Sequence, residues 1–143
     1  MVKAINVLKV ISAFVFLVTL LFVYSFLPVM VTLNPEDASW AAHKGHFFYG
    51  ILAGFILLNI FLLILERMLN GLIQNEEIRA WIKGLAFVLN LYLSFIVGYV
   101  GVMNNSVHFQ NGSYGYLNYL GPIIIFGWIS GLIFLATKKH KTS

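Results

Sequence analysis

The uncharged run from Phe47 to Leu65 most constrains what this chain can fold into. Asn59 is its one strongly polar residue, His43 and His46 precede it, and Glu66-Arg67 follows it. As a helix the run would be about 28 Å long, close to the thickness of the hydrocarbon core of a bilayer. The sequence therefore predicts a membrane-spanning helix here rather than a helix of a soluble core.

Composition places the whole chain in the same class. Of its 143 residues, 60% are hydrophobic and 10% are charged, with a mean hydropathy of +0.89; soluble domains carry about 25% charged residues. The net charge of +4 comes from lysines and arginines spread over short connections, which is typical of membrane topology, so we expect no nucleic-acid partner. The absence of cysteine excludes disulfides and thiolate metal sites.

Three further uncharged runs complete a pattern of four spans. We predict an all-α integral membrane protein, a single domain over residues 1–143, whose four transmembrane helices form an up-down bundle. The spans are expected at residues 10–33, 47–65, 84–103 and 117–137.

The connections carry their own signals. Pro28 predicts a kink or an early end of the first helix near Phe26-Leu27, because proline lacks the N–H that a helix needs. In the loop 34–46, a helix-capping Asn34 before Pro35 favours a short surface helix over residues 35–44. The loop 66–83 is expected to turn near Gln74-Asn75.

The distribution of basic residues predicts the orientation. Eight lysines and arginines lie on one side of the four spans and only Lys44 lies on the other; the eight are Lys3, Lys9, Arg67, Arg79, Lys83, Lys138, Lys139 and Lys141. By the positive-inside rule, both termini and loop 66–83 are cytoplasmic, and loops 34–46 and 104–116 face outward. We expect a multi-pass protein of a bacterial-type cytoplasmic (inner) membrane.

Histidine is the first candidate for chemistry. His43 and His46 are three residues apart and His108 lies in the other outer loop, so the three could form a metal or redox site at the outer surface. The alternative is that they are polar residues at the ends of spans, since no complete metal-binding motif is present. Apart from this site, no cofactor is expected.

Polar residues inside the spans are a second candidate. Asn59 and Asn90 fall at similar depths in an antiparallel pair of helices, where they could hydrogen-bond to each other or line a path for a solute or ion. Glu66 and Arg67 end the second span and are interpreted as an interfacial anchor. Gly98, Gly101, Gly127 and Gly131 are expected to allow close helix packing.

These features favour an interaction role. The sequence contains no recognisable catalytic motif, so we expect an accessory subunit of a membrane complex, or a homo-oligomer, rather than an enzyme. Its expected partners are the lipid bilayer and another membrane protein or a second copy. A small oligomeric transporter or channel with a path past Asn59 and Asn90, and an outer-surface histidine site, remain alternatives.

Overall fold

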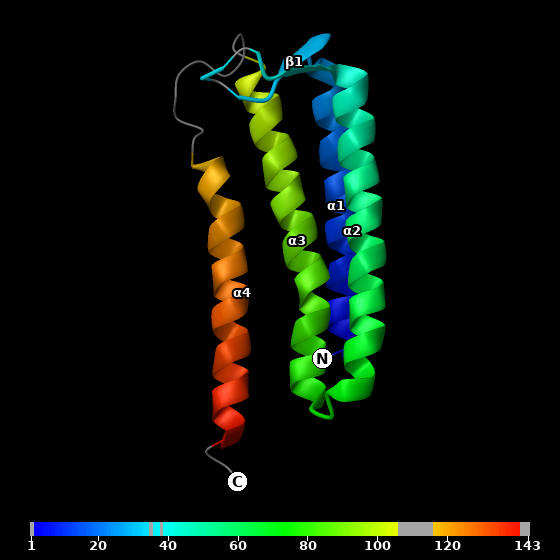
Figure 1. Ribbon diagram of the computed structural model, residues 1–143, viewed down its shortest axis with the longest axis vertical. Coiled ribbons are helices and arrows are strands. Elements are labelled where there is room, and N and C mark those ends of the chain that lie inside the picture. Colours follow the sequence, from blue (N-terminus) through cyan, green and yellow to red (C-terminus); the bar gives the residue numbers. More distant parts are fainter. Residues whose placement is uncertain (1, 35, 38, 106–115, 141–143) are drawn as a thin grey trace.

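The computed structural model describes residues 2–34, 36–37, 39–105 and 116–140, and it is all-α apart from one short pair of strands (Figure 1). All four helices are long and apolar enough to cross a membrane, as expected of a multi-pass membrane protein. In chain order the elements are α1 (Val2–Phe26), β1 (Met30–Thr32), β2 (Ala41–His43), α2 (Lys44–Leu72), α3 (Glu76–Met103) and α4 (Leu117–His140).

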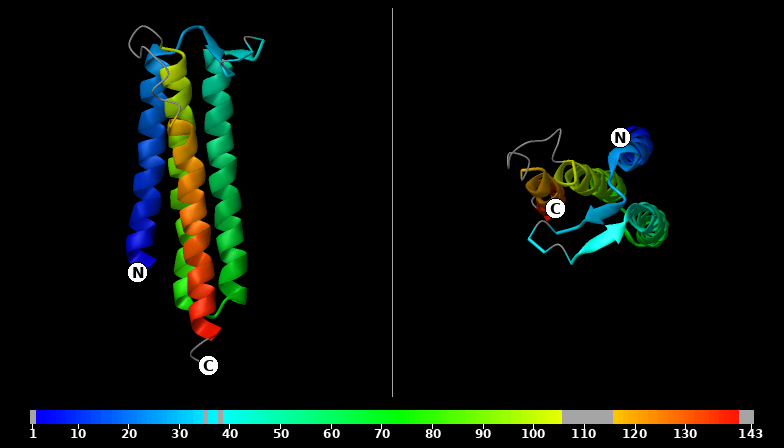
Figure 2. Two further views of the ribbon diagram at one scale, coloured as in Figure 1. Left: turned by 90° about the vertical axis from the view of Figure 1, so that its left-hand side faces the viewer. Right: turned by 90° about the horizontal axis from the view of Figure 1, so that it is seen from above.

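Helix α3 is the centre of the arrangement. It contacts α1, α2 and α4, whereas α4 contacts α3 alone among the described elements. Seen from above in Figure 2, α4 lies on one side of α3, and α1 and α2 lie on the other. Successive helices run in opposite directions, and the start of α1 and the end of α4 lie at the same end of the molecule (Figure 1). Helices α1, α2 and α3 pack together, and α4 lies outside this group against α3 alone among the described elements. The four helices therefore do not form a closed bundle.

The connection between α1 and α2 differs from its prediction. Helix α1 ends at Phe26, where Pro28 was expected to end it, but the predicted surface helix over residues 35–44 is wrong. Strands β1 and β2 pair in antiparallel fashion, with Val31 opposite Ala42. Asn34, which was expected to cap a helix, instead closes a turn, since its side chain accepts a hydrogen bond from the Glu36 N–H (3.0 Å). The Asp37 side chain likewise accepts one from the Ser39 N–H (2.9 Å).

Asn104 fastens this hairpin to α3. Its side-chain oxygen accepts a hydrogen bond from the Thr32 N–H (2.7 Å), and its amide nitrogen donates to the carbonyls of Thr32 and Val100, both at 2.9 Å. The primary amide thus satisfies the free edge of β1 and a carbonyl in the last turn of α3 together.

The apolar core lies between α1, α2 and α3, toward the hairpin. Phe16 of α1 stacks on Phe55 of α2 with ring centroids 4.2 Å apart. The core is completed by buried residues of all three helices and of the hairpin: Leu20, Val23, Leu27, Val31, Phe47, Val97 and Val100. The large apolar side chains on the outward faces of the helices are exposed, which suggests contact with the lipid bilayer.

Candidate functional site

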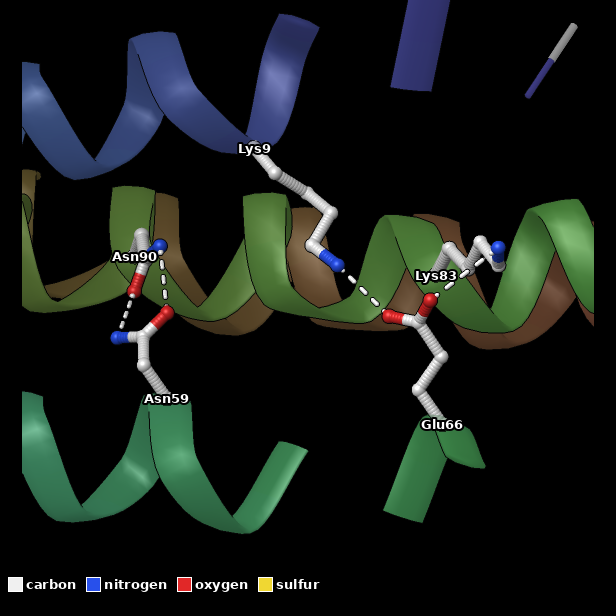
Figure 3. A network of polar contacts seen from close by, with 5 residues as sticks. All are labelled: Lys9, Asn59, Glu66, Lys83 and Asn90. Carbon is white, nitrogen blue, oxygen red and sulfur yellow. Dashed lines mark hydrogen bonds and ion pairs between the residues drawn. The ribbon is translucent and has the colours of Figure 1, made fainter. Parts of the chain in front are cut away.

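Two amides meet halfway along the helices. Asn59 of α2 donates a hydrogen bond from Nδ2 to Oδ1 of Asn90 on α3 (2.9 Å), and Asn90 donates from Nδ2 to Oδ1 of Asn59 (3.2 Å) (Figure 3). Asn90 is buried and its Nδ2 also reaches Oγ of the buried Ser12 at 3.5 Å. Helix α2 runs from Lys44 to Leu72, so Asn59 and its partner lie near the midpoint of that helix.

The carboxylate of Glu66 forms ion pairs with two other helices, closer than the asparagine pair to the end of the molecule where α1 begins. Glu66 of α2 binds Nζ of Lys9 on α1 through Oε2 (2.7 Å) and Nζ of Lys83 on α3 through Oε1 (3.2 Å) (Figure 3). The three side chains are 17–19% exposed. Two cations and one carboxylate leave an excess of one positive charge in this ion cluster, defined here as Lys9, Glu66 and Lys83.

The ion cluster lies well inside the helix ends. Lys9 lies about two helical turns after the start of α1, and Lys83 lies about two turns after the start of α3. Glu66 lies slightly less than two turns before the end of α2. These positions are therefore about 10 Å from the helix ends, since each turn rises about 5.4 Å. Charged groups at such a depth are costly unless they are paired, and these are paired with one another.

The interpretation of Glu66 and Arg67 as one anchoring pair does not describe Glu66. Arg67 is exposed, whereas Glu66 faces two cations on other helices. A signal for the ion cluster was present in the sequence: Lys9, Glu66 and Lys83 each flank an apolar run on the same predicted side, so packed spans bring them to one level.

An apolar cleft opens between α1 and α4, and α3 forms its floor. Its volume is about 380 Å³, and its lining is almost wholly hydrocarbon, with contributions from Ala4, Ile5, Leu8, Ala80, Trp81, Gly84, Phe87, Val88, Ile124, Gly127 and Trp128. The two indoles join α3 to α4: the ring N–H of Trp81 donates to the Trp128 carbonyl (2.9 Å), and that of Trp128 donates to the Trp81 carbonyl (3.0 Å). With both N–H groups satisfied, the rings present apolar surface.

Three glycines lie where helices approach closely. A Cβ on Gly131 would overlap the Trp81 ring, and one on Gly121 would overlap the Tyr92 ring; these two sites bring α4 against α3. A Cβ on Gly101 of α3 would meet Val23 of α1 at 2.9 Å.

The other two glycines that the sequence singled out are not at such contacts. No described atom outside their own helical turn lies within 4 Å of a Cβ built on Gly98 or Gly127. Sequence reasoning missed Gly121, because its aromatic partner belongs to the preceding helix and no local pattern links the two.

His43 and His46 lie at the hairpin end of the molecule, where α2 begins. Nδ1 of His43 accepts a hydrogen bond from the Gly45 N–H (3.1 Å) and so caps α2, and its ring lies edge-on to His46 at 5.8 Å between centroids. His108 lies outside the described residues. Within the residues that the structure describes, no group of three His, Asp or Glu side chains could hold a metal ion.

Asp37 lies in the same hairpin, at the turn between the strands. Hydrogen bonds from the hydroxyl and then the backbone N–H of Ser39 stabilise its carboxylate and lower its pKa. The effect is local to an exposed turn.

Comparison of this chain with protein-family models, with curated proteins and with solved structures finds no match. The class of the protein, a multi-pass membrane protein, therefore rests on its four long apolar helices.

Proposed function

We propose that this protein is a small interaction subunit, which receives an apolar helix of a neighbouring membrane protein, or of a second copy, in the cleft between α1 and α4. The cleft carries this proposal because the packing of α1, α3 and α4 leaves an apolar concavity there rather than a filled seam. A concavity of this size accommodates the bulky side chains of one face of a helix.

Small residues support the proposal. Ala4, Gly84 and Gly127 lie in the cleft, and small residues let helix backbones approach closely, which is how helices associate in lipid. Helix α4 supports it too, since α3 is its one partner among the described elements and its remaining faces are available to a neighbour.

We further propose that both termini are cytoplasmic, in a bacterial-type cytoplasmic membrane. Of the eight lysines and arginines among the described residues, seven lie toward the end of the molecule where α1 begins and α4 ends, and Lys44 lies at the hairpin end. The positive-inside rule assigns the more basic side to the cytoplasm.

Filling the cleft tests the interaction role. Gly127→Leu adds a side chain in a position with no described atom within 4 Å, so the fold should tolerate it while the cleft is blocked. Gly54→Leu is the matched control, because Gly54 is equally unobstructed and lies on α2, away from the cleft.

The measurement is association in mild detergent, by light scattering for a second copy and by affinity purification for another protein. The wild type and Gly54→Leu should associate, and Gly127→Leu should not. A wild-type protein that is monomeric and purifies alone would contradict the proposal.

A path for a solute or ion is the second candidate, and the buried polar groups favour it. The Ser12 hydroxyl donates to the backbone carbonyl of Lys9, and on its other side it lies 3.5 Å from Nδ2 of Asn90, which pairs with Asn59 halfway along the helices. Beyond that point Phe16 and Leu20 fill the space, so transport would require helix movement. Flux into proteoliposomes that Asn59→Leu abolishes without unfolding the protein would support this candidate; absence of flux for a broad panel of solutes would count against it.

A further inference from the structure

A polar pocket lies at the end of the helices where the chain begins. Its volume is about 280 Å³, and its lining comes from three helices: Val2 of α1, Asn70 of α2, and Glu76, Arg79 and Lys83 of α3. It is distinct from the apolar cleft, with which it shares no residue.

Arg79 is the unexplained group in this pocket. Its Nε is buried, and within the described residues it finds no hydrogen-bond acceptor. Its Nη2 approaches Oε1 of Glu76 at 3.8 Å, which is too long for a hydrogen bond, and the Glu76 side chain is 86% exposed. The Arg79 side chain is 32% exposed and lines the pocket, so its Nη groups are donors that a ligand oxygen could satisfy.

The charges around the pocket favour an anion. Lys83 binds Glu66 through one contact, and its ammonium group has three donors, so it can donate to a second acceptor. Counting the ion cluster with the pocket gives three cations, Lys9, Arg79 and Lys83, against two carboxylates, Glu66 and Glu76. The excess of one positive charge equals the charge of one phosphodiester.

The position of the pocket indicates the source of that anion. Helix α3 has 28 residues and is about 42 Å long, which exceeds the hydrocarbon core of about 30 Å and matches a bilayer with its headgroup layers. Glu76 is the first residue of α3, and Asn70 lies in the last turn of α2. The pocket thus lies at the level of lipid headgroups when the helices span a membrane.

We propose that this pocket binds the phosphate of an anionic phospholipid. The two Nη groups of Arg79 donate to two phosphate oxygens in the bidentate geometry that guanidinium favours, and Lys83 donates to one of them. Glu76 competes with the phosphate for Arg79 and moves aside when the lipid binds. This proposal does not depend on a partner in the apolar cleft.

Lipid titration of the full-length protein tests it. Purified protein in a neutral detergent is titrated with phosphatidylglycerol, and bound lipid is counted by native mass spectrometry. Arg79→Gln should weaken binding roughly tenfold, because charge-assisted hydrogen bonds are lost. Arg67→Gln, which removes the same charge from an exposed position on α2, should leave binding unchanged. Glu76→Gln should tighten binding, because it removes the competing carboxylate.

Two further measurements separate lipid binding by the guanidinium from a general effect of charge and from binding of a soluble anion. Arg79→Lys retains the charge but loses the bidentate geometry, so it should weaken binding while the thermal stability stays at the wild-type level. Inorganic phosphate at millimolar concentration should not displace the lipid.

Three outcomes would overturn the proposal. These are equal losses in Arg79→Gln and Arg67→Gln, unchanged lipid binding in Arg79→Gln, and binding of inorganic phosphate at Arg79 without retention of lipid. The last would assign the pocket to a soluble anion.

Discussion

Asn59 and Asn90 form a pair in which each amide is both donor and acceptor to the other. In an apolar environment an amide without a partner is costly, so the two residues fix the rotation of α2 relative to α3. Either asparagine without the other would lower the stability of the fold, because its amide would lose this partner.

The energetics of the pair can be measured by a double-mutant cycle. Asn59→Leu should lower the free energy of unfolding by roughly 1 kcal/mol, since it leaves Asn90 with only the distant Ser12 hydroxyl. The double variant with Asn90→Leu should lose no more than the less stable single variant, because no amide is then left unsatisfied. Unfolding by SDS in mixed micelles measures all three, and additive losses would show that the two side chains act independently.

Glu66 holds two cations of other helices, so its removal leaves both without a counter-charge. Glu66→Gln should destabilise the protein by on the order of 3 kcal/mol. Glu77 is an exposed carboxylate in the first turn of α3, so Glu77→Gln should lower the free energy of unfolding by less than about 1 kcal/mol.

A triple variant separates loss of charge pairing from loss of packing. Lys9→Met, Glu66→Leu and Lys83→Met together remove all three charges, so this variant should be more stable than Glu66→Gln. Thermal unfolding in detergent provides the comparison. A triple variant less stable than the single one would contradict the view that unpaired charge is the cost.

At the scale of elements, α4 is held to α3 by aromatic rings seated on glycines. Gly131→Ala should destabilise this contact by about 1–3 kcal/mol, because the new Cβ overlaps the Trp81 ring. Gly127→Ala, one turn away on the same helix, meets no described atom within 4 Å and should be neutral. The thermal stability of the two variants is compared by unfolding in detergent. Equal changes in stability would indicate that they arise from helix propensity rather than from packing against Trp81.

Sequence reasoning predicted the elements better than the contacts between them. The four helices follow from long uncharged runs, and the end of α1 at Phe26 follows from Pro28, because both are local properties of the chain. The hairpin was missed because Asn34 suits a helix start and a turn equally well, and the pairing of β1 with β2 decides between them. The ion pairs of Glu66 were not predicted, because its partners are on other helices.

Within the candidate site, too, the features that depend on position along the chain were predictable, and those that depend on how the helices pack were not. The depth of the two asparagines can be counted along the chain, which is why their proximity was expected. The cleft could not be expected, because it depends on where α1 and α4 lie relative to α3. The polar pocket could not be expected either, because it depends on how the start of α1 and the end of α2 lie against α3.

At the scale of the whole molecule, orientation is open to direct measurement. The chain contains no cysteine, so single cysteines report their own accessibility. In intact bacterial cells with a permeabilised outer layer, an impermeant maleimide should label Trp40→Cys, in the hairpin connection. Lys3→Cys and Lys138→Cys should be labelled only after the cytoplasmic membrane is opened. The opposite pattern would place both termini outside.

The association of a neighbouring helix with the cleft is the central claim, and photo-crosslinking in the native membrane tests it most directly. A photoreactive phenylalanine analogue at Leu8 or Ile124 lies in the cleft, and one at Leu57 lies on the exposed face of α2. We predict that Leu8 and Ile124 yield the same discrete protein adduct, and that Leu57 does not. Adducts with lipid alone at the cleft positions, or the same protein adduct from Leu57, would contradict the account.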